Sequence, residues 1–323
     1  MRVILLGTED FFILSYPVML LLAVLAGLGT LAWRIRRYSF DHAALLVPLT
    51  VALLIGWLGS RLAIGLVKDG ARGFSWRLFL PTEHAPMSFT LFVTIACPVL
   101  LLGLWRRRAN TLAYLDMLAP SALVAFAVAK VGCLLAGCCG GGECPPGWGL
   151  RYPYGSRPYA LQVANGRIKP AQALLRNEEN GNPELFGHVD FLRAVRPAPP
   201  EELTHHARRY GLTYGEWVRL AEMERSEPVW PVPLFYSVSA GLLWLVAEAV
   251  FVRSRRAGWT LAVVLVAYAA MRLGLDLLVA HPGRPSLGIP VAQLIAFVPL
   301  IAGIVLAILC ALKKTPVPDW GTK

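Results

Sequence analysis

One uncharged stretch of the chain, residues 290–312, reads PVAQLIAFVPLIAGIVLAILCAL. It exceeds the length of about 20 residues that an α-helix needs to cross the hydrocarbon core of a bilayer. Its apolar side chains cover every face of such a helix rather than one stripe, which is typical of a helix surrounded by lipid or protein. This stretch therefore predicts a membrane-spanning helix.

Six further apolar runs repeat this pattern along the chain. They lie at about 14–33, 43–67, 88–105, 112–137, 232–252 and 259–280. Only 16% of the residues are charged and 56% are hydrophobic, whereas soluble domains carry about 25% charged residues. We therefore predict an all-α polytopic membrane protein with about seven transmembrane helices and a small polar outer lobe.

The polar lobe divides the predicted helices into two groups. Residues 1–137 hold the first four transmembrane helices, residues 138–231 form the lobe, and residues 232–323 hold the last three helices and a cytoplasmic tail. The lobe begins with glycine- and proline-rich sequence and has a charged helical pattern near 201–224. We expect a partly helical cap over the outer ends of the helices, too short for a large core.

The basic residues predict the orientation in the membrane. The chain carries a formal net charge of +11, and most of this charge lies beside apolar runs, where it directs topology rather than nucleic-acid binding. The four basic clusters are Arg34–Arg37, Arg106–Arg108, Arg253–Arg256, and Lys313 with Lys314. Placing all four in the cytoplasm puts the N-terminus and the lobe outside and the C-terminus inside.

Ionisable residues inside the predicted spans are costly and therefore informative. Five of them are Arg61, Lys130, Glu248, Arg272 and Asp276. Glu248 is near the cytoplasmic end of its span, where we expect it to reach water. Arg272 and Asp276 are spaced i, i+4 on one helix face, and Tyr268 lies one turn earlier.

Two interpretations of the intramembrane cations remain. Three cations at similar depth, with little acid nearby, favour an external anion such as a phospholipid phosphate, which arginine binds bidentately. Alternatively, Arg272 and Asp276 form an internal structural pair, while Arg61 and Lys130 extend to the membrane interface.

A glycine- and cysteine-rich segment follows the fourth span. It reads Gly132-Cys133-Leu-Leu-Ala-Gly137-Cys138-Cys139-Gly140-Gly-Gly-Glu-Cys144. Three interpretations remain: a disulfide among Cys138, Cys139 and Cys144, a zinc site completed by His205 or His206, or packing of small apolar side chains. The tetrapeptide that ends at Cys138 also has the form of a lipobox, so this cysteine is a candidate substrate mimic or lipidation site.

These residues, in this order, resemble the prolipoprotein diacylglyceryl transferase family of bacterial inner-membrane enzymes. The resemblance covers nearly the whole chain outside the lobe. It rests on Tyr16, Met87-Ser-Phe-Thr90, Lys130-Val-Gly-Cys133 through Gly137, Pro231-Val-Pro-Leu-Phe-Tyr236, Tyr268-Ala-Ala-Met-Arg272-Leu-Gly-Leu-Asp276 and Gln293.

The resemblance implies transfer of diacylglyceryl from phosphatidylglycerol to the lipobox cysteine thiol of a prolipoprotein signal peptide, without a cofactor. It implies that Arg272 holds the phosphate, that Asp276 orients this arginine, and that Lys130 replaces the signature arginine. The implied substrate-binding residues are Tyr16, Arg61, Thr90, Gly132, Cys133, Gly137, Cys138 and Tyr268.

The chain departs from the usual family pattern at four positions. The family signature has arginine, asparagine and glutamate where this chain has Lys130, Cys133 and Cys138, and Thr90 replaces a histidine that is a candidate to activate the thiol. The alternative is a phospholipid-binding membrane protein of the same fold that has lost this base. A transporter is disfavoured because no internal repeat is visible.

Overall fold

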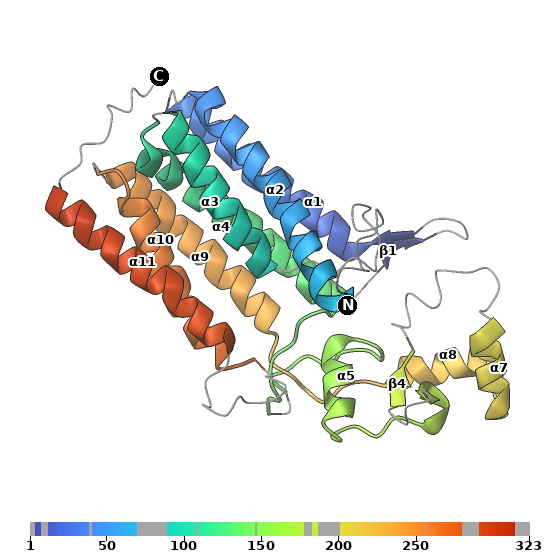
Figure 1. Ribbon diagram of the computed structural model, residues 1–323. Coiled ribbons are helices and arrows are strands. Elements are labelled where there is room, and N and C mark those ends of the chain that lie inside the picture. Colours follow the sequence, from blue (N-terminus) through green and yellow to red (C-terminus); the bar gives the residue numbers. More distant parts are fainter. Residues whose placement is uncertain are drawn as a thin grey trace.

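The computed structural model describes residues 4–7, 12–38, 41–69, 89–107, 109–145, 147–177, 183–186, 201–254, 256–279 and 291–313. Seven long helices form a bundle (Figure 1). They are α1 (Ser15–Arg37), α2 (His42–Asp69), α3 (Phe89–Arg106), α4 (Thr111–Ala136), α9 (Val232–Arg253), α10 (Trp259–Asp276) and α11 (Val291–Lys313). A hairpin of β1 (Ile4–Gly7) and β2 (Phe12–Leu14) precedes α1.

The seven helices coincide with the seven predicted spans. In the described part of the chain, six of them are long and apolar enough to cross a membrane, and α3 contributes a shorter apolar helix, Leu91–Arg106. The prediction of an all-α polytopic membrane protein is therefore confirmed.

Helix α4 lies at the centre of the bundle and packs against α1, α9 and α10, while α2 packs on α3 and α11 on α10. Two glycines bring α1 and α4 close together. A Cβ atom added to Gly132 would lie 2.8 Å from Cβ of Met19, and one added to Gly27 would lie 3.0 Å from Cβ of Ala125. Such small residues let transmembrane helices approach closely, which gains van der Waals contact that lipid does not supply.

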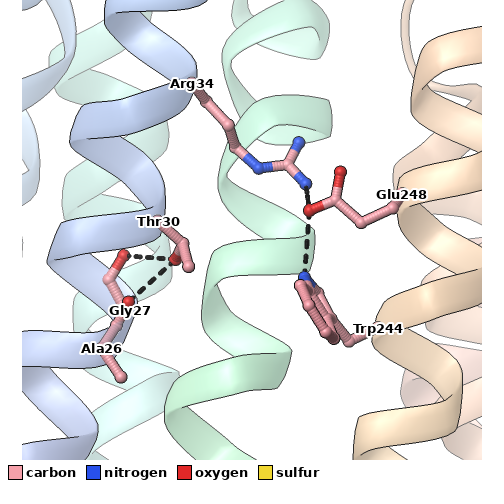
Figure 2. Close-up of polar contacts among 6 residues, drawn as sticks. All are labelled: Ala26, Gly27, Thr30, Arg34, Trp244 and Glu248. Atoms are coloured by element: carbon pink, nitrogen blue, oxygen red, sulfur yellow. Dashed lines mark hydrogen bonds and ion pairs between the residues drawn. The ribbon is translucent and has the colours of Figure 1, made fainter.

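A buried ion pair joins α1 to α9 near the end of the bundle where α1 stops (Figure 2). Arg34 is fully buried and pairs with Glu248, whose carboxylate also accepts a hydrogen bond of 3.0 Å from Nε1 of Trp244. The Arg34 guanidinium lies 4.9 Å from the ring centre of Phe251. The expectation that Glu248 simply reaches water was wrong, because its carboxylate pairs with Arg34. The sequence does not indicate this pair, since the two residues lie on helices far apart in the chain.

A buried carboxylate fixes the start of α10. Asp116, in α4, accepts hydrogen bonds of 2.6 Å from the backbone N–H of Gly258 and 2.7 Å from that of Leu261. These are donors that the first turn of a helix leaves without intrahelical partners, and a carboxylate there also complements the helix dipole. This contact sets the position of α10 relative to α4.

The segment between α4 and α9 forms a lobe at one end of the bundle (Figure 1). It contains α5 (Arg157–Ala164), the short 3-10 helix η3 (Gln172–Leu174), a hairpin of β3 (Leu175–Asn177) and β4 (Pro183–Leu185), α7 (Glu201–Arg209) and α8 (Tyr214–Met223). Trp217 is fully buried at its centre and donates a hydrogen bond of 2.6 Å from Nε1 to the carbonyl of Ala173. The lobe therefore has a core of its own.

Replacing Glu248 tests the ion pair. Glu248→Leu leaves the Arg34 guanidinium buried without its counter-charge, which costs about 3–5 kcal/mol of stability. We expect a clear drop in the thermal unfolding temperature of the detergent-solubilised protein. The double variant Arg34→Met/Glu248→Leu removes both charges and should recover most of the loss. Equal stability of the wild-type and the Glu248→Leu proteins would show that the pair does not hold α1 and α9 together.

Candidate functional site

Three polar side chains meet where α9 begins and α10 ends. Tyr236, in the first turns of α9, donates a hydrogen bond of 2.9 Å from its hydroxyl to Oδ1 of Asp276. The other oxygen of this carboxylate, Oδ2, lies 3.7 Å from Nε of Arg272, one turn earlier in α10. Asp276 is buried, whereas 25% of the Arg272 side chain is exposed. The carboxylate is thus held by two partners, and the guanidinium has room for a further ligand.

Lys130 links α4 to this group through aromatic rings. Its ammonium nitrogen lies 4.8 Å from the ring centre of Tyr236 and 5.2 Å from that of Phe126. The Phe126 ring in turn packs edge-on against Tyr236 and Tyr268, with centroid distances of 6.1 and 5.7 Å. Because the faces of aromatic rings attract cations, these two rings stabilise the ammonium group.

Three cysteines converge at the end of α4. Gly137 ends the helix in a left-handed conformation, with φ of 62°, and its N–H bonds the carbonyl of Leu134. This conformation favours glycine and turns the chain so that Cys138 and Cys139 lie beside Cys133. The three sulfur atoms all lie within 4.8 Å of one another, and those of Cys138 and Cys139 are 3.7 Å apart.

The lobe holds this turn in place. The fully buried Tyr152 donates a hydrogen bond of 3.2 Å from its hydroxyl to the carbonyl of Cys139, and Gly137 accepts one of 3.3 Å from the N–H of Arg157. A few residues later, Gly142 donates a hydrogen bond of 2.7 Å to the carbonyl of Leu278, just beyond α10. This cysteine turn, residues 133–139, is therefore tied to both the lobe and the end of α10.

The groups around the turn lower the pKa of one of its thiols. Hydrogen bonds from the thiols of Cys133 and Cys138 hold the pKa of Cys139 well below its usual range, and the charges of Lys130 and Arg157 act in the same direction. Lys130 thus lies close enough to influence the cysteines while it contacts Tyr236. The site is one continuous arrangement that runs from the cysteine turn through Lys130 and Tyr236 to Asp276 and Arg272.

The structure brings several of the predicted site residues together. Lys130, Tyr268, Arg272 and Asp276 belong to the arrangement, Cys133 and Cys138 belong to the cysteine turn, and Tyr16 on α1 packs against Gly132 beside that turn. Gly132 and Gly137 shape the backbone, as described above.

Other predicted residues stand elsewhere. Arg61 is buried on α2, with its guanidinium 4.8 Å from the ring centre of Trp57. Thr90 lies in the first turn of α3 and Gln293 in that of α11, and both side chains are outside the described residues. His206 contacts the carbonyl of Ala173 in the lobe core. Among the described residues, the metal-sized group of side chains at the turn includes neither a histidine nor Cys144.

Two residues central to the geometry were not among the predicted site residues. Tyr236 connects Lys130 to Asp276, and Cys139 completes the group of three thiols. The signal for Tyr236 was its place at the end of the segment that begins at Pro231. The sequence around the cysteines does not indicate that Cys139, rather than Cys144, lies close to Cys133.

Two surface grooves flank α9 and α10. One, of about 390 Å³, runs between the two helices and is lined mainly by apolar side chains, including Leu242, Met271 and Leu275. Met271 directly precedes Arg272 in the sequence, and Leu275 lies three residues after it. The other, of about 610 Å³, lies where α9 ends and α10 begins, and Arg253 and Arg256 line it.

Comparisons with known proteins point in one direction. The family described as prolipoprotein diacylglyceryl transferase matches residues 3–309. A phosphatidylglycerol–prolipoprotein diacylglyceryl transferase of Rhodopirellula baltica is 22% identical over 361 residues, which cover 90% of this chain and 71% of that protein. A protein of the same name from Dehalococcoides mccartyi is 30% identical over 156 residues, which cover 46% of this chain and 57% of that protein.

Tyr236→Phe tests the link between α9 and α10. The variant keeps the ring under Lys130 but removes the hydroxyl, so a buried carboxylate oxygen loses its donor at a cost of about 1–3 kcal/mol. We expect a lower thermal unfolding temperature in detergent. Tyr210→Phe, at an exposed tyrosine of the lobe, is the matched control and should leave it unchanged. Equal behaviour of the two variants would rule out a structural role for this hydrogen bond.

Proposed function

The chain belongs to the prolipoprotein diacylglyceryl transferase family, and we propose that it transfers the diacylglyceryl group of phosphatidylglycerol to the lipobox cysteine thiol of a prolipoprotein. The observation that carries this proposal is the partly exposed Arg272, which pairs with the buried Asp276 and is connected through Tyr236 to a second cation, Lys130. A phosphodiester in the membrane is an anion that such a pair of cations fits.

The reaction joins sulfur to carbon and releases a phosphate ester. The sulfur of the lipobox cysteine forms a bond to the terminal glyceryl carbon of the lipid, and the bond from this carbon to the phosphate oxygen breaks. Its electron pair leaves with glycerol phosphate, and the thiol proton passes to solvent. Negative charge grows on the departing phosphate, so fixed cations around it stabilise the transition state more than the bound lipid.

Each residue of the arrangement has a role in this proposal. Arg272 binds the phosphate with its guanidinium, and Asp276, itself held by Tyr236, fixes the orientation of that arginine. Lys130 supplies the second positive charge on the side of the cysteine turn, where the acceptor thiol would approach. The groove between α9 and α10, which includes Met271, would take an acyl chain of the lipid on its apolar surface.

The arrangement of the helix ends supports the proposed orientation. Helices α1, α3 and α9 finish with basic residues at the end of the bundle opposite the lobe (Figure 1). Since cytoplasmic loops of bacterial membrane proteins are rich in lysine and arginine, we place that end in the cytoplasm of an inner-membrane protein. The lobe and the proposed site then lie toward the outer surface, which exported prolipoproteins reach.

One observation favours a second candidate function. Thr90 stands where the family pattern has a histidine, and threonine does not act as a general base at neutral pH. A chain that binds phosphatidylglycerol through Arg272 but transfers nothing would fit this substitution. The two functions differ in whether glycerol phosphate is released.

Arg272→Ala tests the proposed transfer. With purified protein, phosphatidylglycerol and a synthetic lipobox peptide, we expect the wild type to release glycerol phosphate and add a diacylglyceryl mass to the peptide. Loss of a charged group that stabilises the transition state costs about 10²–10³ in rate, so the variant should fall near background. Arg253→Ala, at the other end of α9, is the control and should keep full activity. Full activity in Arg272→Ala at equal expression would contradict the proposed role.

Labelling of single positions tests the orientation. Lys169→Cys adds a thiol on the exposed surface of the lobe, and Arg37→Cys adds one at the exposed end of α1. A membrane-impermeant maleimide applied to intact spheroplasts should label the first variant above the unsubstituted protein and the second only after permeabilisation. The reverse pattern would overturn the assignment of the lobe to the outer side.

A further inference from the structure

The three thiols of the cysteine turn have no role in the transfer reaction proposed above. Cys133, Cys138 and Cys139 are free thiols from two adjoining segments, the last turn of α4 and the residues after it. Their sulfur atoms converge within 4.8 Å of one another, while the other thiol of the same segment, Cys144, stands outside the group. In the described part of the chain, no other group of histidine, cysteine and acidic side chains converges in this way.

The spacing of the sulfur atoms matches what a metal ion requires. Zn–S bonds of about 2.3 Å in a tetrahedral site place neighbouring sulfurs about 3.8 Å apart. The sulfurs of Cys138 and Cys139 are 3.7 Å apart, and Cys133 lies within 4.8 Å of both. Small side-chain rotations would therefore bring all three into coordinating positions, and Gly137 already provides the backbone turn.

Charge and surroundings also favour a bound cation. Three thiolates around Zn²⁺ carry a net charge of −1, and Lys130 and Arg157 are positive groups whose charges reach the turn. The ring of Tyr152 lies beside Gly137 and its hydroxyl holds the carbonyl of Cys139, while Tyr16 lies near the three thiols. Zinc sites generally have such outer contacts, which orient the ligands.

Three protein ligands leave one position open. Structural zinc sites use four protein ligands, whereas catalytic sites use three and keep the fourth for water or substrate. A soft thiol is a preferred fourth ligand for an ion that three thiolates already hold. The proposed acceptor of this protein is a thiol, and the turn lies beside Lys130, which faces the phosphate-binding side of the site.

We propose that Cys133, Cys138 and Cys139 bind one Zn²⁺ ion and that the acceptor cysteine thiol of the substrate takes its fourth position. This inference rests on the proposed function for the identity of the acceptor. It accounts for the lack of a histidine at Thr90, because coordination rather than a base removes the thiol proton. Cys133 and Cys138 also stand at two of the positions where the usual signature has other polar residues.

The metal changes only the first part of the reaction. On coordination the acceptor thiol gives up its proton to solvent and becomes a zinc-bound thiolate, since a metal ion lowers the pKa of a thiol that binds it. The thiolate sulfur then bonds to the glyceryl carbon as the carbon–oxygen bond to phosphate breaks, and the electron pair leaves on glycerol phosphate. The thioether product is a weak ligand and dissociates from the ion.

The test uses the full-length protein in detergent, purified without chelator or reductant. Metal analysis should find one zinc per chain. After removal of the metal, titration with Co²⁺ as a spectroscopic probe should give a thiolate-to-cobalt charge-transfer band that saturates at one ion per chain. Cys133→Ser and Cys139→Ser should lose this band, and Cys144→Ser, the matched control, should keep it.

Addition of substrate tests the open position. A lipobox peptide should increase the charge-transfer band of the cobalt protein by adding a fourth thiolate, and the same peptide with serine in place of its cysteine should leave the band unchanged. Three results would overturn the inference: no metal bound, copper bound in place of zinc, or a disulfide between two of the three cysteines in freshly purified protein.

The outcomes separate this inference from the proposed function. Full transfer activity in metal-free protein would overturn the role of the zinc ion in activating the acceptor thiol and leave the transferase standing. Cobalt binding that responds to the peptide, with no product from phosphatidylglycerol, would support the thiol site and contradict the transfer. Because the cobalt measurement reads binding alone, it does not depend on activity.

Discussion

The structure depends on one constraint: a charged or polar group inside an apolar bundle must find its partner within the bundle, since lipid offers none. Three of the buried polar groups meet that constraint by joining two helices. Arg34 and Glu248 connect α1 to α9, Asp116 connects α4 to the start of α10, and the carboxylate of Asp276 connects α10 to α9 through Tyr236. These contacts fix the helices whose side chains form the proposed site.

Arg272 differs from the buried members of these contacts because its side chain is partly exposed. Its nearest acid, Asp276, already accepts a hydrogen bond from Tyr236 and lies 3.7 Å from Nε of the arginine, and a quarter of the arginine side chain is exposed. Lys130 has aromatic faces as neighbours. Because Arg272 is partly exposed and Lys130 lies over aromatic rings, we propose that these two cations bind the phosphate of an anionic lipid in addition to their contacts within the bundle. The lobe adds the cysteine turn to the same place by holding the backbone of Cys139 and Gly137.

The helices could be predicted from the sequence because the length and apolarity of a span are local properties. The seven predicted runs agree with the seven helices to within a few residues at most ends. The pair of Arg272 and Asp276 was predictable for the same reason, since both lie on one helix face. Contacts between distant segments could not be predicted. In the sequence Arg34 belongs to a basic cluster that indicates topology, and nothing there indicates its ion pair with Glu248. Likewise, nothing in the sequence indicates the contacts of Tyr236 with Lys130 and Asp276. The grouping of Cys133 with Cys138 and Cys139 depends on the left-handed backbone at Gly137, which a sequence pattern does not specify.

The most direct test of the central claim is a cryo-electron microscopy structure of the protein in nanodiscs that contain phosphatidylglycerol. The account predicts phosphate density against the guanidinium of Arg272, within reach of Lys130, and an acyl chain in the groove between α9 and α10. A headgroup bound instead in the groove lined by Arg253 and Arg256 at the opposite end of the bundle, with Arg272 bound only to Asp276, would contradict it.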